Sequence, residues 1–105
     1  MAERKKPVGA TGIQSGGDRT LNLTAAAVIK ARPGIVGILT VITTVTGTIS
    51  IHDCLTTGAA AATNAIYTSA ANPVAGTVVK LDFPCRTGIV FSGTISAGIC
   101  ALSWE

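Results

Sequence analysis

The chain has 105 residues, enough for one modest hydrophobic core and for one domain at most. Apolar residues make up 48% of it and charged residues only 12%, which excludes an intrinsically disordered protein and a coiled coil. The net charge of +3 is concentrated in residues 1–32, which hold six basic and two acidic residues. The nearly neutral, apolar remainder is expected to bury surface against copies of itself.

The first segment in chain order, residues 1–19, is rich in glycine. Four glycines between positions 9 and 17 weaken both helix and strand, and a proline at position 7 removes a backbone donor. We therefore expect an extended arm without regular structure of its own, which becomes ordered on the surface of a partner. Its basic residues are the candidate assembly contacts: Arg4, Lys5, Lys6 and Arg19.

From residue 20 onward, β-branched residues dominate and turn residues recur at short intervals, which is typical of strands. We expect strands over 21–30 and 35–43, separated by a turn at Arg32-Pro33-Gly34. The 35–43 strand is apolar almost throughout. This pattern indicates burial on both faces, or one face against the core and the other against another subunit.

A third strand, 48–53, alternates between apolar and polar residues. Ile49 and Ile51 are expected to face inward. The residues between them and beside them are expected to face outward: Thr48, Ser50 and His52. Gly47 is expected in a short hairpin turn before this strand.

The interpretation of residues 54–76 stays open between strand, helix and loop. Gly58 and the four alanines after it favour a helical turn, whereas 63–69 favours an edge strand. Further strands are expected over 76–83, which Pro84 ends, and over 87–92 and 95–104, which Gly93 separates. Val79, Leu81 and Phe83 are expected to share one face, and Trp104 to cover an end of the fold or an interface.

About seven strands with turns every 8–12 residues predict an all-β fold. We expect a single domain over 20–105, a small antiparallel β-sandwich or barrel that carries the basic arm 1–19. No segment reaches the roughly 18 apolar residues that cross a bilayer, and no apolar segment of a signal peptide follows the charged start. Synthesis in a cytoplasm, with no membrane contact, is therefore expected.

The candidate sites favour structure over chemistry. His52, Asp53 and Cys54 are neighbours, but adjacent strand residues point to opposite faces and cannot converge on one atom. Asp53, at a strand end, is expected to form a turn in which its carboxylate bonds local backbone amides. Three cysteines without metal-type spacing, Cys54, Cys85 and Cys100, are expected as buried thiols, with a single later disulfide as the alternative. The sequence predicts no catalytic, cofactor-binding or metal-ligating residue and no enzyme.

Three stretches stand out in order: 47–53 (GTISIHD), 73–79 (PVAGTVV) and 83–94 (FPCRTGIVFSGT). They resemble a loose family of small β-proteins encoded among the virion genes of tailed bacteriophages, prophages and gene transfer agents. Members of that family are head decoration, head-spike base or fibre-base components. The resemblance covers about residues 35–104.

The resemblance implies a non-enzymatic virion component without a cofactor, present as a symmetric homo-oligomer, a trimer or pentamer rather than a dimer. Its expected partners are the major capsid protein or other virion proteins, and its expected place is the capsid surface. The alternative is a small nucleic-acid-binding protein that contacts phosphates with Arg4, Lys5 and Lys6. That role is the less expected one, because no aromatic platform accompanies these three residues.

Overall fold

The computed structural model describes residues 17–105 and is built from antiparallel strands. Six strands and two short 3-10 turns follow in chain order: β1 (Asp18–Leu23), β2 (Ala27–Lys30), β3 (Gly34–His52), η1 (Thr57–Ala59), η2 (Ala62–Asn64), β4 (Ala65–Thr68), β5 (Val78–Cys85) and β6 (Ile89–Trp104). The all-β, antiparallel fold predicted from the turn spacing is confirmed. Within the described part of the chain, no helix has the length and hydropathy needed to span a membrane.

Two long strands, β3 and β6, organise the sheet. They pair from Val36 opposite Trp104 to His52 opposite Val90. β1 and then β2 pair along the other side of β6, whereas β5 and β4 pair along the other side of β3. Between β4 and β5 the chain stays on β3, because the amides of residues 69, 72 and 76 donate to β3 carbonyls. The result is a ribbon four strands wide.

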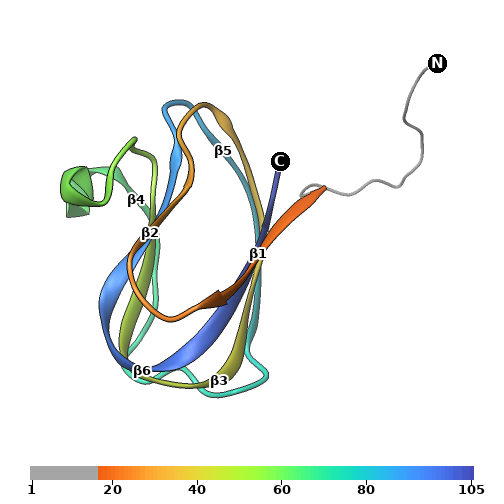
Figure 1. The fold of residues 1–105 in the computed structure, drawn as a ribbon, viewed down its shortest axis with the longest axis vertical. Coiled ribbons are helices and arrows are strands. Elements are labelled where there is room, and N and C mark those ends of the chain that lie inside the picture. The colour runs from red at the N-terminus through yellow and green to blue at the C-terminus, as the bar shows by residue number, and fades with distance from the viewer. Residues whose placement is uncertain (1–16) are drawn as a thin grey trace.

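This ribbon is folded over on itself near the middle of β3 and β6, which curve through the lower end of the view in Figure 1. Gly47, Gly93 and Gly98 lie in and beside the bend with φ values of +115°, +133° and +118°. A Cβ on Gly47 would collide with the Thr94 carbonyl oxygen. The turn predicted at Gly47 and the break predicted at Gly93 are therefore wrong: a positive φ lets each strand bend and continue.

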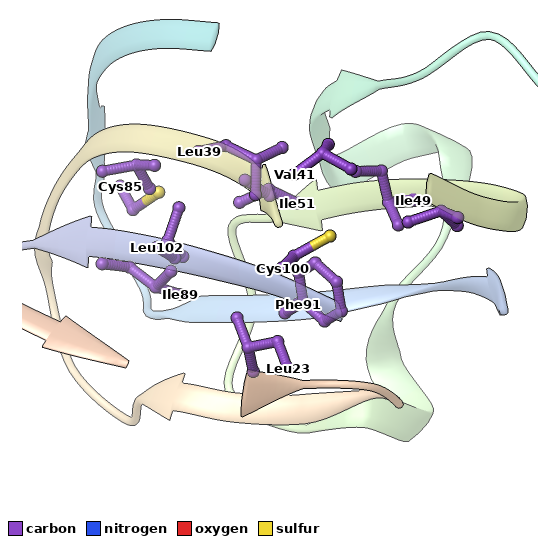
Figure 2. Packing of buried hydrophobic residues seen from close by; sticks show 12 residues of the cluster. Leu23, Leu39, Val41, Ile49, Ile51, Cys85, Ile89, Phe91, Cys100 and Leu102 are labelled. Carbon is purple, nitrogen blue, oxygen red and sulfur yellow. The ribbon is translucent and has the colours of Figure 1, made fainter. Parts of the chain in front are cut away.

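The core lies between the two halves of the folded ribbon. Leu39 precedes the bend in β3 and Ile51 follows it, yet both are fully buried in one cluster with Phe91 and Leu102 of β6. Figure 2 shows these side chains gathered between the strands. Ile49 is buried with them, so the predicted inward direction of Ile49 and Ile51 is confirmed. Each such side chain stabilises the fold by about 1.5–3 kcal/mol on burial.

Other boundaries differ from the prediction. The 54–76 segment contains η1, η2 and the short edge strand β4, so both predicted features occur. β5 runs through Pro84, because an edge strand tolerates a missing backbone donor. Phe83 is exposed and does not share the half-buried environment of Val79 and Leu81. Six strands replace the seven expected: β3 and β6 each join two expected strands, and the strand expected over 21–30 is divided into β1 and β2.

The predicted arm also ends earlier than expected. β1 begins at Asp18, and Arg19 is a strand residue opposite Ser103. Arg19 is therefore part of the sheet, because backbone pairing with β6 extends to the end of that strand. The other predicted arm residues, Arg4, Lys5 and Lys6, lie outside the described residues.

Candidate interaction surface

The single histidine belongs to a hydrogen-bonded cluster on the outward side of β3. The Ser50 hydroxyl is 2.8 Å from Nε2 of His52, and Nδ1 of His52 is 2.8 Å from Oδ1 of Asn64. Because that amide oxygen only accepts, we assign the proton to Nδ1, and Nε2 then accepts from Ser50. His52 is only 6% exposed, so the prediction that Ser50 and His52 face solvent is wrong. Alternation identified the side of the strand but not the loop that covers it.

The same cluster organises the covering loop. Oδ1 of Asn64 also accepts the Ala61 amide at 3.0 Å, and its Nδ2 donates to the Ala59 carbonyl at 2.9 Å. The same series of groups, a hydroxyl bonded to an imidazole that is bonded to an amide, also occurs in the active sites of nucleophilic hydrolases. Here the hydroxyl belongs to Ser50, which is 9% exposed and lies in a strand paired on both sides. In this structure, the contacts hold residues 59–64 against β3.

Asp53 follows β3 and fixes the connection between β5 and β6. Its carboxylate accepts the backbone amides of Arg86 at 2.9 Å, Thr87 at 2.8 Å and Gly88 at 3.2 Å. Burial alone raises the pKa of Asp53, but these amides and the Arg86 charge outweigh it and lower the pKa from 3.8. The prediction that Asp53 bonds local backbone amides is wrong, because the turn whose amides it binds lies 33 to 35 residues further along the chain.

The three cysteines are buried and form no disulfide, as predicted. Burial raises the pKa of each thiol, and at Cys85 the nearby Asp53 and Cys54 contribute to a value of about 11. A protonated thiol is a poor nucleophile and a poor metal ligand. Among residues 17–105, no three His, Cys, Asp or Glu side chains are grouped so that they could hold a metal ion.

In the other half of the folded ribbon, the outward side is mainly apolar, and no described residue covers it. β1, the last part of β6, the first part of β3, and β5 lie side by side here, and opposite residues share a face. We call this surface the outer face. It consists of Arg19, Leu21, Ile38, Thr40, Ile42, Val78, Lys80, Ala101 and Ser103. Leu21 is 60% exposed and Val78 is 61% exposed, so the apolar side chains are open to solvent.

A shallow hollow of about 260 Å³ lies in the middle of the outer face. It is lined by Arg19, Ile38, Thr40, Ala101, Leu102 and Ser103. Beside it lies a β-bulge: the pairing passes from Val36–Trp104 to Leu39–Leu102, so two β3 residues stand opposite Ser103 alone. The Ile38 amide donates to the Ser103 hydroxyl at 2.8 Å and holds the bulge in place. The shape of the hollow is therefore set by the folded backbone of β3 and β6.

The two edges of this half are poorly suited to accept another strand. β5 contains Pro84, which has no amide hydrogen, and Asp82, whose φ is +47°. β1 carries a bulge at Asn22, whose φ is +58°. Prolines, bulges and charged residues are the features by which sheets prevent edge-to-edge pairing. A partner is therefore expected to meet the outer face and not the edges.

No family model, no curated protein and no solved structure matches this chain. Function is therefore inferred from the outer face and from the sequence pattern.

The sequence held one signal for the outer face. Strand 35–43 is apolar at successive positions, and the structure places Leu39 and Val41 in the core but leaves Ile38 and Ile42 on the outer face. Within residues 17–105, this strand is therefore not buried on both faces. Leu21 and Val78 were not predicted as surface residues, because they are apolar and the pairings of both strands contain bulges that local sequence does not reveal.

Proposed function

We propose that this protein is a non-enzymatic structural component of a phage or phage-like particle. It forms a symmetric oligomer that docks on the capsid as a decoration protein or as the base of a spike or fibre. The observation that carries this proposal is the mainly apolar outer face, which no residue of 17–105 covers, on a sheet whose other face already forms the core. Large exposed apolar patches mark interaction sites in proteins that otherwise stay dispersed. Closed symmetry hides such a patch in every copy.

The virion part of the proposal rests on the resemblance of residues 35–104, and the structure is compatible with it at specific positions. GTISIHD is the second half of β3 with Asp53 at its end, and FPCRTGIVFSGT is the corner between β5 and β6. The Asp53 carboxylate bonds the amides in the centre of that corner. Two of the three stretches that carry the resemblance, 47–53 and 83–94, thus meet in one structural unit.

Light scattering after size exclusion tests the oligomeric part. We expect one species near three or five times 10.5 kDa, unchanged between low and high salt, because apolar contacts are not screened. A monomer at both salt concentrations contradicts it.

The capsid part is tested on particles induced in the bacterium that carries the coding sequence. Gradient-purified particles are expected to contain this chain in constant proportion to the major capsid protein. Deletion of residues 2–16, which precede β1, is expected to remove the chain from particles while the fold remains. Particles that lack the full-length chain contradict docking, and unchanged docking of the deletion variant contradicts a role for the arm.

Nucleic-acid binding remains the second candidate, because a basic residue, Lys30, lies at the end of the sandwich where the chain enters β1. The Lys30 side chain lies against Gly34, and its Nζ is 5.7 Å from the centroid of the Trp104 ring. The chain enters β1 at this same end, where Asp18 pairs with Trp104. Fluorescence anisotropy with a labelled DNA oligonucleotide tests this role. Binding that falls with salt, and that weakens when Arg4, Lys5 and Lys6 become alanine, supports it over capsid docking.

A further inference from the structure

The hollow on the outer face has the chemistry of a site for one aromatic ring. Ala101 and Ser103 are small, and Ile38 and Thr40 provide aliphatic surface. Arg19 adds a guanidinium group, and among residues 17–105 no carboxylate lines the hollow. A cation beside apolar walls favours the face of an aromatic ring, and a volume of about 260 Å³ leaves room for a single large side chain.

One aromatic ring of the chain is available for such a contact. The four aromatic residues all lie within the described residues. Phe91 is fully buried, Trp104 donates to the Thr20 hydroxyl, and Tyr67 packs against the core. Phe83 on β5 is 45% exposed, next to the bulge at Asp82. It is therefore the large aromatic side chain that the fold leaves open to solvent.

We propose that Phe83 of one copy inserts into the outer-face hollow of the next copy. This interface rests on the proposed function, because it requires that the protein form an oligomer. It adds which surfaces of two copies meet. Phe83 pairs opposite Val36, a core residue, whereas the hollow opens on the outward side of the same half-sheet. Ring and hollow are thus different patches. In the proposed trimer or pentamer such a contact is head-to-tail, and a rotation that closes joins the copies into a ring. An aromatic side chain in a desolvated pocket is the usual anchor of such an interface.

Matched single variants of the full chain test this interface. Phe83→Ala removes the ring but keeps the hollow, and Ala101→Gln fills the hollow but keeps the ring. Leu55→Ala is the control, because it removes an exposed apolar side chain that lies outside both patches. We expect both interface variants to have the monomer mass by light scattering, with circular dichroism and melting temperature like the wild type. Leu55→Ala is expected to keep the wild-type mass, and Thr40→Arg replaces Ala101→Gln if that variant does not fold.

Mixing the two interface variants is the decisive measurement. The hollow of Phe83→Ala and the ring of Ala101→Gln still match, so an equimolar mixture is expected to form a heterodimer near twice 10.5 kDa. A mixture that stays monomeric overturns the head-to-tail contact. A wild-type multimer that both variants retain overturns this interface while leaving the proposed oligomer intact. A monomeric wild type overturns both.

Discussion

Asp53 places one carboxylate against three backbone amides of the connection 86–88. Asp53→Ala leaves those amides without their partner, so we expect the free energy of unfolding to fall by about 1–3 kcal/mol. Urea denaturation at neutral pH measures the difference. Asp18→Asn at the exposed start of β1 is the control and should change stability by less than about 0.5 kcal/mol. Equal losses in the two variants would contradict the role of Asp53.

The lowered pKa of Asp53 makes this stabilisation depend on pH. The folded protein releases the Asp53 proton at lower pH than the unfolded chain does, so the folded state binds fewer protons between the two pKa values. The stabilisation is therefore fully present above the ordinary value of 3.8 and is lost as pH falls through the folded pKa. Melting temperatures of wild type and Asp53→Ala should differ at neutral pH and converge in strong acid. A constant difference down to the lowest pH would show that the carboxylate charge is not involved.

Ile51 is the residue-scale test of the core. Its side chain is fully buried after the bend in β3 and packs in the same cluster as Leu39 from before the bend. Ile51→Ala should leave a cavity and lower the free energy of unfolding by about 2–5 kcal/mol, and Ile51→Val by about 0.5–1.5 kcal/mol. Val74→Ala, at an exposed position, is the control. A small loss for Ile51→Ala in urea denaturation would mean that the two halves do not pack on this residue.

At the scale of elements, the bend in β3 depends on glycine at position 47. Its φ is +115°, its amide donates to Oδ1 of Asn72 at 2.8 Å, and a Cβ there would meet the Thr94 carbonyl. Gly47→Ala therefore combines backbone strain of about 1–3 kcal/mol with a collision against the paired strand. We expect a loss above about 3 kcal/mol, or a failure to fold. Gly58→Ala in η1, where a Cβ meets nothing, should leave the melting temperature unchanged or slightly raised. Similar melting temperatures for both variants would contradict the bend.

At the scale of the whole molecule, the sandwich shields its three thiols. Cys54, Cys85 and Cys100 are buried, and their raised pKa values keep the thiols protonated near neutral pH. We expect an aromatic disulfide reagent at pH 8 to modify the native protein far more slowly than the urea-unfolded chain, in which three thiols react at once. Rapid modification of one thiol in the native protein would show that the end of the sandwich near Asp53 opens locally.

Much of the fold was predictable at the level of its elements. β-branched residues and turn signals indicated strands, and strict alternation over 48–53 identified Ile49 and Ile51 as core residues. The same local signals misplaced the strand ends, because a glycine that bends a strand and a glycine that ends one look alike in sequence. Gly47 and Gly93 bend their strands because the partner strand follows them through the bend and keeps the ladder paired.

The candidate interaction surface was predictable only in part. The apolar run 35–43 indicated a strand with two apolar faces, but not that the second face remains open. His52 shows the opposite case, since a residue on the outward side of its strand is buried by the loop around Asn64. Exposure depends on what lies over a face, and that is set by contacts between residues far apart in the chain.

By itself, the sequence determined the class of fold, the inward residues of the alternating strand and the buried state of the cysteines, because these follow from composition and from a period of two. Only the tertiary structure decided where strands bend, which amides Asp53 binds, and that two separate patches, an outer face with a hollow and an exposed Phe83, remain open to solvent. These features arise when β1, β3, β5 and β6 are brought into register, and register is a property of paired strands that no single stretch of chain contains.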